Sequence, residues 1–255
     1  MIIVVDLDDT LLNSEHKISD YDLNVLKRAK TKGHKIVVST LRSLVRCLDI
    51  SKYIDADVTS CFLGNFCISN TGEVIKSNPL PFKDFEKVIQ SFKSVYDGWI
   101  GFESDKMSVI ANREVAAKYN GVEFVEQDKV LEILKNSAVF KLSFECKDDE
   151  KIISEFKKLA ENFGVGFKFS RGFRYIDLFP KNTEKAETLK FIKQMFNEEM
   201  IVFGDDLSDK KSIELADTGV AMQNALDEVK QVADIVADSN NNSGVGKVLE
   251  KLLNL

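Results

Sequence analysis

The chain has 255 residues, of which 44% are hydrophobic and 30% charged, and its formal net charge at pH 7 is −6. This balance is typical of a soluble globular protein with one large domain or two modest ones. The acidic charge and the lack of a basic stripe disfavour nucleic acid as a partner, while a local cluster of cations still permits a small anionic substrate. No apolar run is long enough to span a bilayer, so no membrane partner is expected.

Cysteines and histidines are sparse and unpaired. The four cysteines form no CxxC motif, and there are only two histidines. This pattern predicts reduced thiols rather than a zinc site or a disulfide framework. Together with an N-terminus that lacks a signal-peptide pattern, it predicts a cytoplasmic protein. The oligomeric state is left open, and a monomer is compatible with the sequence.

Three apolar runs near the two ends of the chain predict strands that are buried on both faces. They are "IIVV" at 2–5, "KIVVS" at 35–39 and "MIVFG" at 200–204. A helix is predicted between the first two, with Ser19 as its N-cap and Gly33 at its end. Alternating strands and helices predict an α/β core with a Rossmann-like parallel sheet.

The middle of the chain has a different pattern. "VFKLSFEC" at 139–146 alternates apolar and polar residues, as do 166–170 and 175–179. Alternation is typical of antiparallel strands with one open face. Apolar stripes at helical spacing, within 85–92 and 152–163, predict helices that pack on them. This region is therefore predicted to be α+β.

The three prolines lie at the borders of this middle region. Pro79 and Pro81 precede it and Pro180 follows it. Proline stops helices and strands from continuing through a connection. The predicted division is a discontinuous core of 1–81 and 180–255, and an inserted α+β domain of 82–179.

Acidic and hydroxyl side chains follow each of the three core strands. Taken alone, the Asp-rich stretch after the first strand is explained by a solvated turn. The carboxyl ends of parallel strands, however, meet at one edge of a sheet. Side chains from all three strand ends are therefore expected at that edge: Asp6, Asp8, Ser39, Thr40, Asp205, Asp206 and Asp209.

This group of side chains predicts a metal-assisted reaction on a phosphate. Carboxylates without histidine or cysteine ligands suit a hard cation, and Mg²⁺ fits best. Lys185, near the start of a helix, and Thr40 would hold the phosphoryl oxygens. A carboxylate nucleophile, Mg²⁺, a lysine and a hydroxyl are the parts that phosphoryl transfer needs.

Four motifs in this order, "DLDDT", "VVSTLR", "PKNTEK" and "FGDDLSD", resemble those of the haloacid dehalogenase (HAD) superfamily of phosphatases. The tail "GVAMQNALDEVKQVADIVADSNNNSGVGKVLEKLL" resembles the Cof-like branch, whose members carry a large α/β (C2-type) cap between the second and third motifs. The resemblance covers the whole predicted core and the position of the inserted domain.

The resemblance implies a role for each motif residue. Asp6 is expected to be the nucleophile that forms an aspartyl-phosphate and to bind Mg²⁺ through its other oxygen. Asp8 is expected to be the general acid and base, with its backbone carbonyl on the metal. Asp205 is expected to be a metal ligand and Asp209 a direct or outer one. Thr40 and Lys185 are expected to bind the phosphoryl group.

The chain departs from the family pattern beside these motifs. Leu41 stands where Thr-Gly-Arg has glycine, and Asn65-Phe66-Cys67 replaces Asn-Gly-Ala. Ala186 replaces a glycine and Ser208 an asparagine. Because glycine lets a ligand approach the backbone closely, we expect Leu41 and Phe66 to narrow the substrate pocket, unless both side chains turn into the core.

Further candidates line the predicted pocket less directly. Arg42 is expected to reach the substrate or the cap, or to form a surface ion pair. Arg171 and Arg174 flank a turn of the inserted domain and face either the leaving group or solvent. Asn65 is a candidate for the substrate pocket. The resemblance implies that Asn224 lies near the phosphate, although an asparagine in a turn needs no such role.

The leading hypothesis is a Mg²⁺-dependent phosphatase of small phosphorylated metabolites, such as sugar phosphates. A phosphomutase or phosphotransferase would use the same aspartyl-phosphate but return it to a hydroxyl. A non-enzymatic phosphate-binding regulatory protein would also use carboxylates, a hydroxyl and a lysine. The inserted domain and Asp8 favour an enzyme, because a switch that keeps its phosphate has little use for either.

Overall fold

The computed structural model describes residues 1–170 and 174–255, which divide into two compact units. The core unit comprises Met1–Arg42, Leu48–Lys76 and Glu184–Leu255, and the inserted unit comprises Ser43–Cys47 and Ser77–Thr183. The division predicted at 81/82 and 179/180 stays a prediction of where the inserted domain begins and ends. Among the helices of the described residues, none is long and apolar enough to cross a membrane.

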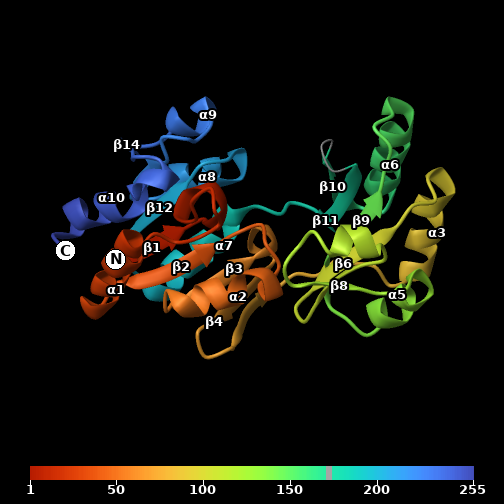
Figure 1. The fold of residues 1–255 in the computed structure, drawn as a ribbon, viewed down its shortest axis with the longest axis horizontal. Helices are drawn as coiled ribbons and strands as arrows, with labels where there is room; N and C mark the ends of the chain where they lie inside the picture. Colours follow the sequence, from red (N-terminus) through yellow and green to blue (C-terminus); the bar gives the residue numbers. More distant parts are fainter. Residues whose placement is uncertain (171–173) are drawn as a thin grey trace. The chain divides into compact units, whose positions relative to one another are not determined.

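The core unit is built on an eight-stranded sheet in the order β14-β13-β12-β1-β2-β3-β4-β5 (Figure 1). Its parallel centre has β1 between β12 and β2, with Val5 opposite both Phe203 and Val38. The strands are β1 Ile2–Val5, β2 Lys35–Ser39, β3 Val58–Cys61, β4 Phe66–Ser69, β5 Val74–Ser77, β12 Met200–Gly204, β13 Thr218–Ala221 and β14 Ile235–Val236.

The predicted apolar strands are confirmed, and all of their residues except Lys35 are buried because helices cover the sheet. Helix α1 packs on α10, and α7 packs on α8. Right-handed connections that leave the centre of a parallel sheet in opposite directions place helices on both of its faces. Ser19 caps α1 by accepting the N–H of Asp22, as predicted. The helices are α1 Asp20–Thr31, α2 Leu44–Tyr53, α7 Lys185–Phe196, α8 Leu207–Leu215, α9 Asp227–Lys230 and α10 Gly244–Leu253.

One edge of the core sheet is not parallel. Strand β4 pairs antiparallel with β3, and Phe66 lies opposite Cys61. The connection is a tight turn, Phe62–Gly64, in which Phe62 and Leu63 both have a positive φ. This hairpin turns the side chain of Phe66 into the core, where it is only 5% exposed.

The inserted unit is a mostly antiparallel sheet with helices, as its alternating pattern predicted, and only the pair of β7 with β8 among its described strands is parallel. Its strand order is β10-β11-β9-β6-β7-β8, and helices α3, α5 and α6 lie on one face of it (Figure 1). Stacked phenylalanines, Phe92 with Phe144 and Phe156, fill the space between helices and sheet. The elements are α3 Phe85–Val95, β6 Ile100–Ser104, β7 Ser108–Ile110, α4 Arg113–Ala116, β8 Val122–Phe124, α5 Gln127–Leu134, β9 Val139–Glu145, α6 Glu150–Asn162, β10 Val165–Ser170 and β11 Tyr175–Pro180.

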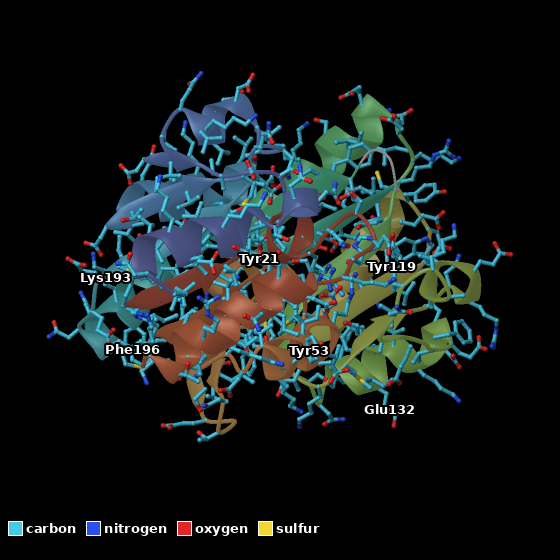
Figure 2. All side chains as sticks on the ribbon, turned by 60° about the vertical axis from the view of Figure 1, so that its left-hand side comes forward. Tyr21, Tyr53, Tyr119, Glu132, Lys193 and Phe196 are labelled. Atoms are coloured by element: carbon cyan, nitrogen blue, oxygen red, sulfur yellow. The ribbon has the colours of Figure 1, made fainter. Side chains whose placement is uncertain are left out.

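The surface of the core unit carries exposed aromatic and apolar side chains, of which Val74, Phe191 and Met195 line one pocket together. Tyr21 and Tyr53 are 40% and 59% exposed and are separate from each other (Figure 2). Scattered exposed apolar groups of this kind are normal for a protein surface.

Candidate active site

The strand ends of the core unit surround a cavity of about 330 Å³. Most of its lining comes from the turns that follow β1, β2 and β12, which is the edge that the sequence predicted. Its lining residues are Asp6, Asp8, Asp9, Thr40, Leu41, Asp205, Asp206, Ser208, Asn224 and Leu226.

A buried ion-pair cluster forms the floor of the site. The ammonium nitrogen of Lys185, the first residue of α7, donates to Asp6 Oδ1 at 2.6 Å and to Asp209 Oδ1 at 2.8 Å. All three residues are less than 10% exposed. Burying one cation between two carboxylates costs much hydration, so such an arrangement points to a function rather than to stability alone.

Three carboxylates meet beside this lysine. Oxygens of Asp6, Asp205 and Asp209 all lie within 4.8 Å of one another. Asp205 Oδ1 accepts a hydrogen bond from Thr10 at 2.7 Å. Asp209 Oδ2 accepts the backbone N–H groups of Asp205 and Asp206, both at 3.3 Å. Asp209 therefore accepts hydrogen bonds on both of its oxygens. Asp6 and Asp205 each have one oxygen that accepts none of the hydrogen bonds named here.

Local sequence explains how Asp209 enters the cluster. It lies in the first turn of α8, where the partial positive charge of a helix N-terminus favours an acidic side chain. Gly204 at the end of β12 makes room for it, since a Cβ at that position would lie 2.4 Å from the Cβ of Asp209. The glycine in "FGDD" is thus required by close packing.

The crowding of carboxylates changes their proton affinity. Burial raises the pKa of Asp6 to about 8; Lys185 opposes this rise and Asp209 adds to it. Burial also raises the pKa of Asp205 to about 6, against the hydrogen bond from Thr10. Burial alone would lower the pKa of Lys185, but Asp6 and Asp209 outweigh it and raise that pKa. The cluster thus carries more negative charge than one lysine neutralises, which favours a bound cation.

The donor set and its spacing fit Mg²⁺. Two ligand oxygens on opposite sides of Mg²⁺ are about 4.2 Å apart and neighbouring ones are closer, so oxygens within 4.8 Å need only a small adjustment. Carboxylates alone, with water, are also the ligands that this ion prefers. Asp6 and Asp205 are the residues best placed to bind it, and Asp209 is placed to hold Asp205 and Lys185.

Asp8 and Arg42 form a pair at the mouth of the cavity. Arg42 Nε donates to Asp8 Oδ2 at 2.9 Å, and a terminal nitrogen of the guanidinium donates to Oδ1. The side chain of Asp8 is 47% exposed and that of Arg42 is 16% exposed. Asp8 thus faces the cavity beside Asp6, and Arg42 forms an ion pair inside the core unit, one of the predicted alternatives.

The candidates in and after the second predicted motif separate into those that line the cavity and those that do not. Thr40 and Leu41 line the cavity; Thr40 is buried and Leu41 is 39% exposed. Asn65 and Phe66 are buried in and before β4 and do not line it. Asn65 instead donates to the carbonyl of Phe62 at 2.8 Å and closes the hairpin turn.

Two of the remaining candidates lie in the inserted unit. Arg174 is exposed, and its carbonyl accepts the N–H of Cys146 at the end of β9. Arg171 lies outside the described residues. Asn224, from the core unit, does line the cavity, and its side chain donates to the carbonyl of Asp9 at 2.7 Å.

Sequence reasoning missed two functional contacts. Thr10 holds Asp205 across 195 residues of chain, and its place in "DLDDT" was the available signal. The pairing of Arg42 with Asp8 has no signal in the spacing of either motif, because it depends on the direction in which two turns leave neighbouring strands.

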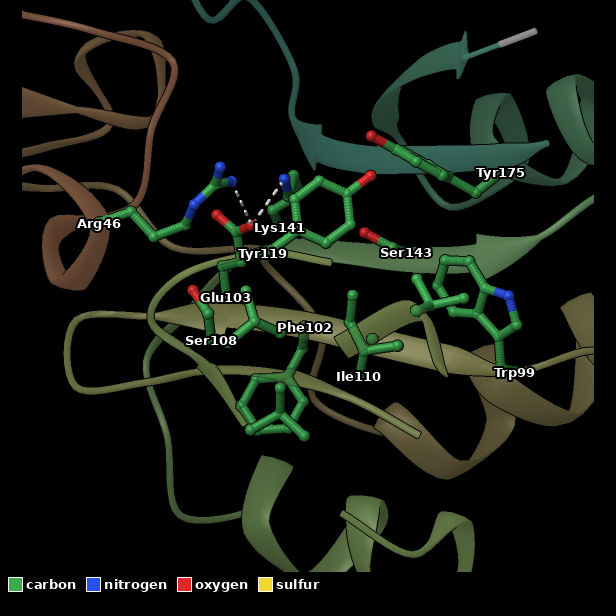
Figure 3. A pocket seen from close by; sticks show the side chains of 14 residues that line it. Arg46, Trp99, Phe102, Glu103, Ser108, Ile110, Tyr119, Lys141, Ser143 and Tyr175 are labelled. Carbon is green, nitrogen blue, oxygen red and sulfur yellow. Dashed lines mark ion pairs between the residues drawn. The ribbon is translucent and has the colours of Figure 1, made fainter. Parts of the chain in front are cut away.

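The inserted unit contains a smaller polar pocket of about 40 Å³ (Figure 3). Lys141 Nζ lies 2.8 Å from Glu103 Oε1, and Arg46 lies 4.0 Å from the same oxygen. Trp99, Tyr119 and Tyr175 are also among the residues that line it. The volume is about that of one water molecule in the liquid, which is too small for a metabolite.

Known proteins are similar to this chain in sequence and in fold. The chain is 29% identical over 294 residues to Phosphatase YwpJ of Bacillus subtilis, covering 99% of each. It is 27% identical over 252 residues to the 5-amino-6-(5-phospho-D-ribitylamino)uracil phosphatase YcsE of the same species, covering 97% of this chain and 94% of that one. The crystal structure of TM0651 from Thermotoga maritima superposes with a TM-score of 0.86 at 28% identity, covering 98% and 96%.

These similarities and the strand-end site together define a hydrolase of phosphate monoesters. Residues 3–249 match the family model of haloacid dehalogenase-like hydrolases, and the chain belongs to this family. The predicted resemblance to HAD phosphatases of the Cof-like branch is therefore confirmed, as is the α/β core with an inserted domain.

Proposed function

We propose that the protein is a Mg²⁺-dependent phosphatase of small phosphorylated metabolites, sugar phosphates or related compounds, and that Asp6 forms an aspartyl-phosphate. The observation that carries this proposal is the position of Asp6. Its carboxylate lies at the end of β1, 2.6 Å from the Lys185 ammonium and within the three-carboxylate cluster. A nucleophile, a cation and ligands for a metal thus meet at one cavity.

In the first step, an oxygen of Asp6 forms a bond to phosphorus while the bond from phosphorus to the substrate oxygen breaks. Asp8 gives its proton to that leaving oxygen, which departs as an alcohol. Lys185 and Thr40 hold the phosphoryl oxygens as their charge is redistributed. When bound, Mg²⁺ would supply charge neutralisation at the same oxygens, held by Asp6 and Asp205.

In the second step, water attacks phosphorus, and the bond between phosphorus and Asp6 breaks to release inorganic phosphate. Asp8 takes the proton of the attacking water and is ready for the next cycle. The pairing of Asp8 supports this role: both of its oxygens accept N–H groups of Arg42, an environment that favours an ionised carboxylate.

The relatives support a metabolite-sized substrate. The name of YcsE states that it acts on a phosphorylated ribitylamino-uracil, which is a small polyhydroxylated phosphate ester. A cavity of about 330 Å³ at the strand ends has the size of a small-molecule site. Its acidic lining also disfavours a long polyanion such as nucleic acid.

Phosphate release from a panel of phosphorylated metabolites and from p-nitrophenyl phosphate tests this function. We expect release with Mg²⁺ and its loss when EDTA removes the metal. Equal release with and without EDTA would contradict the metal dependence. Release of phosphate from none of the esters with Mg²⁺ present would contradict the proposed function itself.

A further inference from the structure

Two asparagines from different loops fasten the turn that carries Asp8. The side-chain nitrogen of Asn224 donates to the carbonyl of Asp9 at 2.7 Å. The side-chain nitrogen of Asn240 donates to the carbonyl of Leu12 at 2.9 Å. One contact lies directly after Asp8 and the other at the end of the turn. Both asparagines are far away in the sequence, after β13 and β14.

The two asparagines act as one unit, here called the asparagine clasp. The backbone N–H of Asn240 donates to Asn224 Oδ1 at 3.0 Å, so the two loops are tied to each other as well as to the turn. Asn240 is only 4% exposed, and its bond to Leu12 is buried. A buried carbonyl that lost this donor would have no water to replace it.

The turn needs such support because its backbone is irregular. Asp8 has an extended conformation (φ −68°, ψ 131°), and Asp9 is left-handed (φ 56°). Two backbone hydrogen bonds close the turn: Leu11 N–H to the Asp6 carbonyl at 3.3 Å and Leu12 N–H to the Leu7 carbonyl at 2.8 Å. Left-handed backbone at a residue other than glycine persists where surrounding contacts fix it.

The loop that provides Asn240 is itself tightly held. Gly244 N–H donates to the carbonyl of Ser239 at 3.2 Å, and a Cβ on Gly244 would lie 2.0 Å from the carbonyl oxygen of Asp238. At the exposed side of the same loop, Asn241 Oδ1 accepts the N–H of Ser14 at 3.0 Å. The turn after β1 is thus fastened to a rigid partner.

We infer that Asn240, acting with Asn224, is a positioning residue that holds the turn 7–12 so that Asp8 stays beside Asp6. This inference rests on the proposed role of Asp8 as general acid and base. The same turn carries Thr10, which binds Asp205 at 2.7 Å. Release of the clasp would therefore disturb Asp8 first and the carboxylate cluster second.

Hydrogen exchange tests the clasp without any activity. Asn240→Asp keeps the shape of the side chain but cannot donate to Leu12. We expect faster exchange in the peptide covering residues 7–14. Asn242→Ala is the matched control: Asn242 is exposed in the same loop, and the described residues offer its side chain no hydrogen bond. Unchanged exchange in Asn240→Asp would overturn the inference.

Kinetics test whether the clasp acts through Asp8. We expect Asn240→Asp to lower kcat on p-nitrophenyl phosphate by about 10- to 100-fold and to leave KM nearly unchanged. This loss is only part of the roughly 10²–10⁴-fold that a general acid and base supplies, because Asp8 is displaced and not removed. In an Asp8→Asn background the same substitution is expected to change kcat little, because the residue it positions is already disabled. An equal loss in both backgrounds would overturn the link to Asp8.

A milder variant covers the case in which Asn240→Asp folds poorly. Asn224→Ala removes an exposed side chain and its bond to Asp9, so we expect a smaller loss of kcat that Asp8→Asn again abolishes. A loss of kcat that follows only the folded fraction would overturn the inference. If the unaltered protein releases no phosphate with Mg²⁺, the proposed function fails, and the exchange experiment still decides whether the clasp holds the turn.

Discussion

Each unit of the protein places a lysine between acidic groups, fully buried in the core unit and partly buried in the inserted unit. The two clusters differ in what surrounds them. In the core unit, Lys185 donates to Asp6 and Asp209. In the inserted unit, Lys141 lies 2.8 Å from Glu103, and the charges of Asp177 and Glu103 raise its pKa although burial opposes this. Charge balance alone therefore does not distinguish an active site from a structural ion pair.

Room and the number of carboxylates around the lysine do distinguish the two clusters. The core cluster adjoins a cavity of about 330 Å³ and gathers three carboxylates around one lysine. The inserted cluster adjoins about 40 Å³, and Asp177 there is bound by the hydroxyl of Ser143 at 2.6 Å. A buried charge indicates a site when it faces space that a substrate can fill.

Among substitutions in the core cluster, Asp6→Asn is expected to cause the largest loss of kcat. Loss of a covalent nucleophile costs on the order of 10⁶-fold in kcat, so phosphate release from p-nitrophenyl phosphate with Mg²⁺ should fall to background. Asp20→Asn, an exposed residue at the start of α1, serves as the control of the same chemistry. Turnover by Asp6→Asn comparable to the control would show that Asp6 is not the nucleophile.

Asp8→Asn should slow catalysis by about 10²–10⁴-fold, the usual contribution of a general acid and base. Affinity for Mg²⁺ should change little, because the expected contact of Asp8 with the metal is its backbone carbonyl, which the substitution keeps. Calorimetric titration with Mg²⁺ and kcat at saturating metal measure the two quantities. Weak Mg²⁺ binding with normal turnover at saturating metal would show that the side chain of Asp8 binds the metal and is not the general acid and base.

Replacing the two lysines with methionine compares the clusters directly. Lys185→Met removes the cation that we propose to hold the phosphoryl group, and we expect a loss of about 10²–10³-fold in kcat. Lys141→Met removes the nearer of the two cations beside Glu103 and leaves Arg46 at 4.0 Å, so the free energy of unfolding should fall by about 1–3 kcal/mol. Its kcat per folded molecule on p-nitrophenyl phosphate should stay the same.

Thermal unfolding measures the loss of stability in both variants, and kcat on p-nitrophenyl phosphate measures the loss of catalysis. A large loss of kcat in folded Lys141→Met would show that the inserted cluster takes part in the reaction. No loss in Lys185→Met would remove the lysine from the proposed mechanism.

Much of the core was predictable because it follows from local patterns. Continuous apolar runs identified β1, β2 and β12, and the carboxyl ends of parallel strands then placed Asp6, Thr40 and Asp205 at one cavity. Burial on both faces of a parallel strand leaves few other residue patterns, so the inference from sequence to strand is direct.

Contacts made by loop side chains were not predictable in the same way. The bonds of Asn240 to Leu12 and of Arg42 to Asp8 join segments whose directions depend on backbone conformation at single residues, such as the left-handed Asp9. Spacing along the chain carries no information on such directions. The same cause separates Phe66 from Leu41, because the β3–β4 hairpin turns Phe66 inward.

The smallest expected effects are those of substitutions at Leu41 and Phe66, which should change substrate selectivity and stability separately. Leu41 is 39% exposed and lines the cavity, so Leu41→Ala should cost little stability and enlarge the space for the leaving group. Because one methylene of misfit is worth about 1–3 kcal/mol, the ratio of kcat/KM for a bulky phosphate ester to that for a small one should rise about tenfold. Phe66→Leu, at a site 5% exposed in β4, should lower stability and leave this ratio unchanged. Kinetics on the two esters, with urea unfolding of each variant, measure both effects. An unchanged ratio in folded Leu41→Ala would place Leu41 outside the substrate pocket, and a raised ratio in Phe66→Leu would show that β4 also shapes it.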